Sequence, residues 1–443
     1  MKLSLRNIGK LREADVEING ITVIAGENNT GKSTVGKALF SVFNGFYDVK
    51  RRIKEEKRKS IARIISSSIN NSNIDDFSST EVFQQKIFPD LPDLNDLIRD
   101  LADLIIEKAG KLKSAQEAFL LVPEVISQNN NMIELSDFSE KDADRLFEVL
   151  SVLDDEAFLK LLDSQIADEF NGQPNNIYSD NSGKMVLTIR DKETEINILN
   201  DHVKDISIML DLQTEAVYID DPFVVDEITP FYSRMLKLRP RPPYDHRSHL
   251  KKNLLQKRQE LLIYDEIVIN KKFDEIFAKI GLNHKGSSIR FPKDFHLIPS
   301  HHIGNGEEKK LNIRNLSTGM KTFLIIKTLL MNETIQQNGT IILDEPEIHL
   351  HPEWQLIFAE LIVLLQKEFD MHILLNTHSP YFLEAIEVYS DFHGIADKCK
   401  YYLAENIDEN NSVIRDTTDN TEPIYKKLAR PFQELENVRY SHD

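Results

Sequence analysis

Cysteine is almost absent from this sequence of 443 residues, since Cys399 is the only one. A single cysteine excludes an intrachain disulfide, and with it the small secreted domains that disulfides hold together. No apolar run approaches the roughly 18 to 20 residues of a membrane-spanning helix. Residues 1–9 also lack the long apolar stretch and cleavage pattern of a secretion signal. We therefore expect a cytoplasmic protein that does not cross a membrane.

Basic residues are outnumbered by acidic ones, with 54 Lys and Arg against 72 Asp and Glu, so the formal net charge is -18. Proteins that bind nucleic acid along a broad surface are usually basic, so any such contact must come from a local patch. Residues 50–63 hold eight Lys or Arg against two Glu, and residues 234–258 hold nine against one Asp. Each patch fits either a solvated helix face or a contact with DNA.

The hydrophobic pattern changes twice along the chain. Short apolar strands and a helix alternate at the N-terminus and again beyond about 310, which predicts an α/β fold with a parallel sheet. The region between is mostly helical in pattern, with some strands. We predict an ATPase domain made of residues 1–48 and 301–400, interrupted by a mainly helical insertion at 49–300 and followed by a C-terminal tail at 401–443.

The strongest motif lies between an apolar strand and a helix. It fits G-x-x-x-x-G-K-[ST], whose glycines let backbone N–H groups point at phosphate oxygens while the helix N-terminus adds its dipole. Lys32 would reach the β- and γ-phosphates of ATP, and Ser33 would bind Mg²⁺. The predicted nucleotide-binding residues are Gly26, Asn28, Asn29, Thr30, Gly31, Lys32, Ser33 and Thr34.

Two carboxylates end a second apolar strand. The run 340–343 carries Asp344 to its tip, where a carboxylate can join Ser33 in binding Mg²⁺. Glu345 can polarise the water that attacks the γ-phosphate. We therefore predict Asp344 as a metal ligand and Glu345 as a catalytic residue.

Two weaker motifs complete the set. Ser317 and Gly319 precede a helix, where they fit a phosphate-binding cap or an ordinary helix N-cap. His378 follows a short strand, where a histidine is either structural or catalytic. The four motifs, in this order, resemble those of the ABC-type ATPases, which include the SMC and RecF proteins. The resemblance covers about 125 residues, roughly 1–45 and 310–390, and implies ATP, Mg²⁺ and a site shared by two copies.

The resemblance also implies roles for the weaker motifs. Ser317 and Gly319 would contact the γ-phosphate of ATP bound to the other copy, and His378 would sense that phosphate. The signature Leu-Ser-Thr-Gly-Met departs from the usual LSGGQ at two positions, so hydrolysis could be slow. A Q-loop glutamine is not evident, with Gln84 and Gln85 as weak candidates.

The residues after Asp344 narrow the resemblance. Residues 344–352 read DEPEIHLHP, which looks like the RecF-like and overcoming-lysogenization-defect ATPases and unlike transporter subunits. The overcoming-lysogenization-defect nucleases carry a Toprim domain after the ATPase, and the roughly 53 residues after Ser390 are too few for that domain. No HNH nuclease pattern is present either. The chain thus resembles stand-alone ATPases of anti-phage defence, such as PtuA of Septu and AriA of PARIS.

Other readings of single motifs remain open. His349 and His351 could form a metal pair, although the family motif explains them better. Asp220 and Asp221 could belong to a metal-dependent nuclease, although a strand-end turn is the simpler reading. His301 and His302 precede a glycine-containing loop and are more simply explained as having no role in metal binding.

We expect an ATP-driven sensor or scaffold that controls a separate effector nuclease of HNH or Toprim type in bacterial anti-phage defence. We expect a homodimer or higher oligomer with composite ATP sites, and possible DNA contact through residues 50–63 and 234–258. The alternative is an ATPase that clamps DNA during repair, as RecF-like and SMC-like proteins do. A third hypothesis is a transporter subunit, which the DEPEIHLHP motif disfavours.

Overall fold

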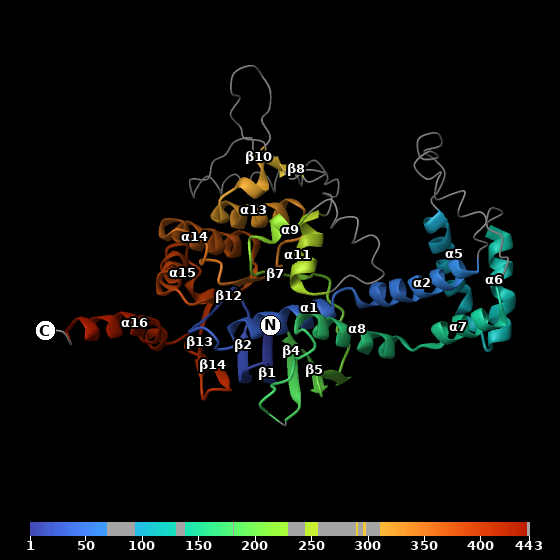
Figure 1. Cartoon of the computed structure of the whole chain (residues 1–443), viewed down its shortest axis with the longest axis horizontal. Helices are drawn as coiled ribbons and strands as arrows, with labels where there is room; N and C mark the ends of the chain where they lie inside the picture. Colours follow the sequence, from blue (N-terminus) through green and yellow to red (C-terminus); the bar gives the residue numbers. More distant parts are fainter. Residues whose placement is uncertain are drawn as a thin grey trace, which may run out of the picture. The chain divides into compact units, whose positions relative to one another are not determined.

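The computed structural model describes residues 1–68, 94–129, 138–179, 181–228, 244–255, 289–290, 296–297 and 311–440. The chain forms two compact units. The main unit joins Met1–Tyr47 to Leu161–Asp443, and the helical unit is Asp48–Lys160. Figure 1 shows the secondary structure of both units.

The main unit is built on an eleven-stranded sheet. Across the sheet the strands are β6 (His202–Ile206), β5 (Lys192–Leu199), β4 (Gly183–Ile189), β1 (Lys2–Ile8), β2 (Leu11–Glu17), β14 (Ser412–Asp416), β13 (Cys399–Asn406), β3 (Ile21–Gly26), β12 (His372–Thr377), β11 (Thr340–Asp344) and β7 (Ala216–Ile219). The mixed α/β class predicted from the sequence is confirmed.

Five neighbouring strands, β13, β3, β12, β11 and β7, run parallel. The carboxyl ends of parallel strands lie at one edge of a sheet, which is where open α/β sheets bind ligands. The chain leaves β3, β12, β11 and β7 at this edge, so the residues that follow these strands come together there. The strands β6, β5, β4, β1 and β2 are instead antiparallel to one another, and β2 then pairs in parallel with β14.

Helices cover the parallel strands. They are α1 (Lys32–Gly45), α9 (Val224–Glu227), α11 (His246–Leu255), α13 (Thr318–Met331), α14 (Pro352–Phe369), α15 (Pro380–Phe392) and α16 (Glu422–Tyr440), with 3-10 turns η3 (Ile313–Asn315) and η4 (Ala396–Lys398). Apolar residues of α11, α13, α14 and α15 share one buried cluster with alternate residues of the parallel strands.

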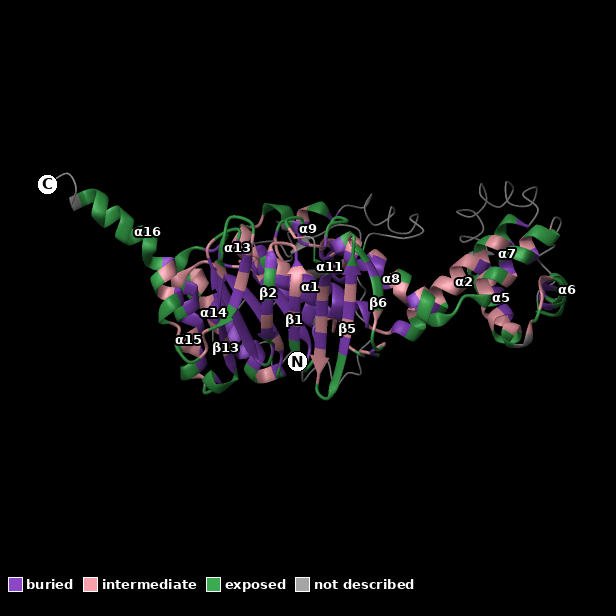
Figure 2. Ribbon diagram, turned by 90° about the horizontal axis from the view of Figure 1, so that it is seen from below, coloured by how far each residue is buried: buried purple, intermediate pink, exposed green. Residues whose placement is uncertain are grey.

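The parallel strands β3, β11 and β7 are buried on both faces. Every residue of β3 and β7 is buried, as are the first four of β11. Figure 2 shows that buried residues run along much of the sheet. Such continuous apolar runs are typical of parallel strands with helices on both faces. Val217 and Ile219 face the shared cluster, so alternation points Tyr218 between them toward the opposite face.

The helical unit has its own core. Its helices are α2 (Val49–Ser67), α5 (Leu94–Lys108), η2 (Ala109–Lys111), α6 (Ala115–Asn129), α7 (Glu140–Ser151) and the first part of α8 (Asp154–Glu169). Buried isoleucines of α2 pack with apolar residues of α5, α6 and α7. Ser139 and Asp142 form a capping box that starts α7.

The structure divides the chain at other positions than the sequence suggested. The helical unit ends at Lys160, and β4 to β7 belong to the main sheet rather than to an insertion reaching residue 300. Residues 401–443, expected to be a tail, include most of β13, β14 and α16, and β13 lies directly beside β3. Three two-residue strands, β8 (Ile289–Arg290), β9 (His296–Leu297) and β10 (Leu311–Asn312), form a separate small sheet.

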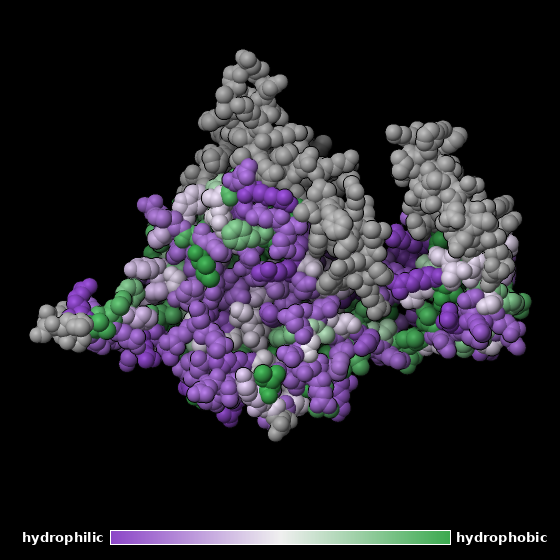
Figure 3. Space-filling view, in the orientation of Figure 1, coloured by the Kyte–Doolittle hydropathy of each residue, from purple (hydrophilic) through white to green (hydrophobic). Residues whose placement is uncertain are grey.

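Among the described residues, no helix combines the length and apolar character that a membrane crossing requires. The face of the protein drawn in Figure 3 is mainly hydrophilic, with scattered apolar side chains.

Candidate functional site

The phosphate loop connects β3 to α1, as its sequence predicts. At Gly26 a Cβ atom would lie 2.4 Å from the carbonyl oxygen of Ala404 on β13, so the neighbouring backbone leaves room only for glycine. Gly31 precedes α1 with φ of 84°, a left-handed conformation that glycine adopts without strain. No side chain caps α1, which leaves backbone N–H groups of its first turn for an anion.

Lys32 is held inside this loop. Its side chain is 4% exposed, and its ammonium donates to the carbonyl oxygens of Gly26 and Glu27 at 3.0 and 2.9 Å. The same nitrogen lies 3.2 Å from Oε1 of Glu345. A buried ammonium requires nearby negative charge, which Glu345 supplies here and phosphate oxygens could supply instead.

The other predicted loop residues lie between these anchors. Thr30 is buried, and its hydroxyl donates to the carbonyl oxygen of Glu27 at 2.8 Å. Asn28, Asn29 and Ser33 are exposed, and Thr34 is half-buried. Ser33 thus presents its hydroxyl at the first turn of α1, at the sheet edge where β11 also ends.

Asp344, the last residue of β11, is held by the two neighbouring strands. The hydroxyl of Tyr218 on β7 donates to Oδ2 at 2.8 Å. The amide of Asn376 on β12 donates to Oδ1 at 2.9 Å. The sequence motifs indicate neither Tyr218 nor Asn376 as a partner of Asp344, and each residue is marked only by its place near the end of an apolar strand.

Glu345 links the phosphate loop to His378. Its backbone has φ of 48°, and its N–H donates to the carbonyl oxygen of Asn376 at 2.9 Å. Oε1 lies 3.2 Å from Nζ of Lys32 and 3.3 Å from Nδ1 of His378. The interaction with His378 is the largest effect on the pKa of Glu345, which is lowered. The same interaction raises the pKa of His378, so the pair favours an ionised carboxylate beside a protonated imidazole.

Glu347 was not predicted to have a role, although it is the second glutamate of the DEPE motif. Its side chain is 2% exposed, and burial raises its pKa. It accepts hydrogen bonds from the hydroxyl of Thr377 and from the backbone N–H of His378, the latter at 3.3 Å. Glu347 therefore ties the loop after β11 to the end of β12 and helps to position His378.

The signature residues begin α13. Ser317 is exposed and caps the helix, with its hydroxyl 3.5 Å from the backbone nitrogen of Met320. A Cβ atom on Gly319 would lie 3.1 Å from Leu350. Lys321 is 3% exposed, and its ammonium donates to Asp226, just beyond β7, at 2.7 Å. These contacts fit an N-cap, and the role of Ser317 and Gly319 toward ATP of a second copy stays a prediction.

The residues at this edge fit ATP with Mg²⁺. The uncapped helix N-terminus and the buried ammonium of Lys32 suit phosphate oxygens. Mg²⁺ is usually held by one or two protein oxygens together with phosphates and water, for which Asp344 and Ser33 supply a carboxylate and a hydroxyl.

The rival metal readings gain no support. His349 and His351 are both exposed, and the described residues include no group of three or more His, Cys, Asp or Glu arranged to hold a metal. Asp220 is paired with His246 and Arg247 at 3.2 and 2.8 Å, as expected for a structural turn. Gln84, Gln85, His301 and His302 lie outside the described residues.

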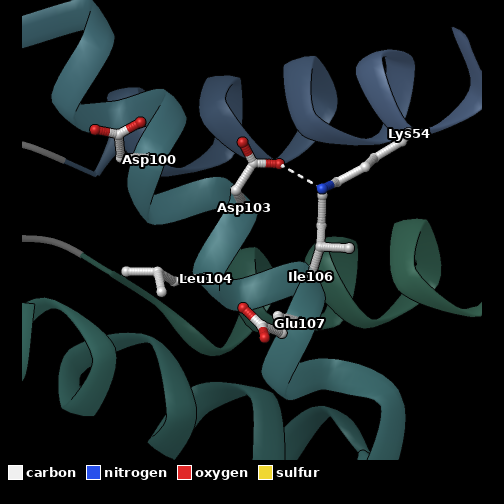
Figure 4. Close-up of a pocket in the computed structure, with 6 residues that line it drawn as sticks. All are labelled: Lys54, Asp100, Asp103, Leu104, Ile106 and Glu107. Carbon is white, nitrogen blue, oxygen red and sulfur yellow. Dashed lines mark ion pairs between the residues drawn. The ribbon is translucent and has the colours of Figure 1, made fainter. Parts of the chain in front are cut away.

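The basic segment 50–63 is largely neutralised within the helical unit. Arg58 and Lys54 of α2 lie 3.1 and 3.5 Å from Asp103 of α5, and Lys57 lies 3.5 Å from Asp154. Figure 4 shows a pocket of about 470 Å³ between α2 and α5, lined by Lys54, Asp100, Asp103, Leu104, Ile106 and Glu107. Three carboxylates around one ammonium would repel a phosphate backbone.

Most of the second basic segment, 234–258, lies outside the described residues. Within its described part, Arg247 lies 2.8 Å from Asp220 and 3.4 Å from Asp221. Lys251 pairs with Glu227. These cations are thus also balanced by carboxylates of the same unit.

A short part of the chain is similar in sequence to a known ATPase. A retron Vc95 probable ATPase of Vibrio cholerae serotype O1 biovar El Tor is 30% identical over 95 residues, which are 19% of this chain and 18% of that protein. The chain therefore aligns with less than a fifth of that relative.

Two solved structures align with nearly the whole chain at low similarity. An Smc head domain bound to the C-terminal domain of ScpA, derived from Pyrococcus furiosus, is 13% identical with a TM-score of 0.37, over 99% of this chain and 98% of that one. CbiO1 of Clostridium perfringens, part of the ABC transporter complex cbiONQ, is 14% identical with a TM-score of 0.32, over 99% and 97%.

The family comparison covers both the phosphate loop and Asp344. It matches residues 21–384 to the family described as "AAA domain, putative AbiEii toxin, Type IV TA system". The phosphate loop lies between β3 and α1, and Asp344 ends β11, where the sequence motifs predicted them. The chain belongs to this AAA family and has a mixed α/β P-loop fold.

Proposed function

We propose that the protein hydrolyses ATP with Mg²⁺ at a site completed by a second copy of the chain. The contact between Glu345, Lys32 and His378 carries this proposal, because it joins the phosphate loop, the strand β11 and the strand β12 in one cluster. A cluster with a buried ammonium, an ionised carboxylate and an imidazole is suited to phosphoryl transfer to water.

Each residue of the cluster has a defined task. Bound Mg²⁺ would neutralise charge that develops on the phosphates. Lys32 would exchange its pair with Glu345 for phosphate oxygens, which releases the carboxylate. Glu345, kept ionised by its surroundings, could then hold a water and accept its proton. His378 would contact the γ-phosphate, and Ser317 and Gly319 of a second copy would close the site.

We further propose that ATP turnover controls a separate effector nuclease in bacterial anti-phage defence. Two comparisons support this idea, since the family description names an AbiEii toxin and the curated relative is a retron ATPase. The helical unit would offer a surface for the effector or for a signal of infection. An HNH or Toprim nuclease, as in Septu or PARIS, is the kind of partner that we expect.

The DNA-clamping alternative has less support from the side chains. It needs cations that are available to phosphate groups, whereas Lys54, Lys57 and Arg58 lie beside carboxylates of their own unit. A DNA clamp would therefore have to use other surfaces.

The purified chain should hydrolyse ATP, and Lys32→Ala should not. Co-purification with a nuclease encoded beside it, followed by a mass measurement, tests the assembly. Nuclease activity should appear only with that partner and should change when ATP is added. A chain without ATPase activity, alone or with its partner, would contradict the proposed chemistry, and an ATPase that never associates with a nuclease would contradict the proposed partnership.

A further inference from the structure

Tyr218 is buried in the sheet yet has a polar group aimed at the site. It is 1% exposed, and it lies on β7, the edge strand next to β11. Tyr218 pairs in register with Ile342, two residues before Asp344. The side chain reaches along the sheet, so that its hydroxyl donates to Oδ2 of Asp344 at 2.8 Å.

The ring of Tyr218 is fixed on two sides. It stacks on His246 of α11, with ring centroids 4.3 Å apart and planes 24° apart. His246 itself is held by Glu169 at 2.7 Å and Asp220 at 3.2 Å. Toward α1, a Cβ atom at Gly36 would lie 3.1 Å from the Tyr218 hydroxyl, so the absence of a side chain at Gly36 leaves the space that the phenol occupies.

Asp344 therefore has limited freedom to rotate. Tyr218 holds one carboxylate oxygen and Asn376 holds the other, at 2.9 Å. A carboxylate accepts more than one interaction per oxygen, so both bonds leave lone pairs for a cation. Groups that orient a metal ligand in this way commonly change metal affinity or activity 10-fold to 100-fold when they are removed.

We propose that Tyr218 is a positioning residue that orients Asp344 for Mg²⁺. The proposal rests on the proposed ATPase function and assigns to β7 a part that the motifs do not indicate. Tyr218 does not touch the nucleotide. It acts through Asp344, so its removal should weaken the use of Mg²⁺ more than the binding of ATP itself.

Tyr218→Phe tests this proposal, because it keeps the stacked ring and removes only the hydroxyl. We expect ATP affinity measured in EDTA to stay within about two-fold of the wild type. The Mg²⁺ concentration for half-maximal hydrolysis should rise about ten-fold. Mn²⁺, which binds oxygen and nitrogen ligands more tightly than Mg²⁺, should reduce this defect.

A matched control is Tyr402→Phe. Tyr402 is also buried, at 2% exposed, but its hydroxyl accepts a hydrogen bond from the backbone of Glu17 at 3.0 Å, on another part of the sheet. This variant should keep the wild-type Mg²⁺ requirement. A requirement that is unchanged in Tyr218→Phe, or ATP affinity in EDTA that falls as far as Mg²⁺ use does, would overturn the positioning role.

Two further arms keep the test decisive. If Tyr218→Phe does not fold, Asn376→Ala removes the other donor to Asp344 and should raise the Mg²⁺ requirement in the same direction; an unchanged requirement counts against the proposal.

If the wild type does not hydrolyse ATP, the proposed function fails by itself. Titrating Mg²⁺ into ATP-loaded wild type and Tyr218→Phe then compares metal binding directly, and equal affinities overturn the inference.

Discussion

Oε1 of Glu345 lies 3.2 Å from the ammonium of Lys32, so the predicted catalytic carboxylate is paired with the predicted phosphate-binding lysine. The two residues are far apart in the sequence and come together because β3 and β11 end at the same edge of the sheet. ATP would compete with Glu345 for Lys32. In the proposed function, arrival of the phosphates therefore releases the carboxylate.

Replacing Lys32 should abolish ATP binding, whereas replacing Glu345 should leave ATP binding intact. Glu345→Gln should retain ATP but lose at least about 100-fold in hydrolysis, because it removes the proton acceptor and leaves Lys32 to the phosphates. Lys32→Ala should lose ATP binding. Isothermal titration and phosphate release measure the two effects, with Glu409→Gln, on an exposed turn, as a control. Hydrolysis at the wild-type rate in Glu345→Gln would remove Glu345 from its catalytic role.

Two inactive variants should restore activity to each other if the site is shared. Lys32→Ala damages the phosphate loop, and Gly319→Asp places a negative charge where a γ-phosphate of a second copy would lie. A mixed dimer contains one site with both residues intact, so part of the ATPase rate should return. Co-expressed, tagged heterodimers provide the measurement.

Gly319→Ala is the control for that experiment. It adds the same Cβ atom, 3.1 Å from Leu350, without the charge, and should retain more activity than Gly319→Asp. If verified heterodimers stay inactive, the two sites are either complete within one chain or obligately coupled, and neither outcome fits independent composite sites.

The free energy of unfolding should decrease at alkaline pH, because His246 loses the proton that its carboxylate partners stabilise. Burial by itself would lower the pKa of this imidazole, but hydrogen bonds to Asp220 and Glu169 outweigh burial and raise the pKa to about 9. The folded-state value lies above the ordinary 6.5, so the stabilisation is fully present below pH 6.5 and is lost as pH rises through about 9. It amounts to at most about 3 kcal/mol.

Thermal unfolding from pH 6.5 to 9.5 measures this loss. The wild type should lose stability over that range relative to His246→Gln, which cannot titrate there. His202→Gln is the matched control, because His202 is 73% exposed and its replacement should leave the wild-type profile. Parallel profiles for wild type and His246→Gln would show that the imidazole is not charged in the folded protein.

Gly26→Ala should destabilise the main sheet. The new methyl group would lie 2.4 Å from the carbonyl oxygen of Ala404, and backbone on a neighbouring parallel strand cannot move without disturbing the ladder. A cost of about 1 to 3 kcal/mol is expected for such overpacking. Calorimetry on Gly26→Ala and on Gly110→Ala, where no atom lies within 4 Å, makes the comparison, and equal unfolding temperatures would contradict it.

The sequence by itself determined the local parts of the site. Gly31, Lys32 and Ser33 follow a buried strand and open a helix, and the residues needed for that turn are contiguous in the chain. Asp344 and Glu345 end an apolar run in the same way. Periodicity and turn chemistry act over a few residues, so these elements could be predicted without knowledge of the fold.

Only the tertiary structure decided which distant groups meet. Tyr218 reaches Asp344 because β7 pairs with β11 in one register, and Asn376 reaches it because β12 pairs on the other side. The insertion of β13 and β14 between β3 and β2 likewise turned an expected tail into part of the sheet. Strand order and register depend on packing between segments hundreds of residues apart, which no local pattern encodes.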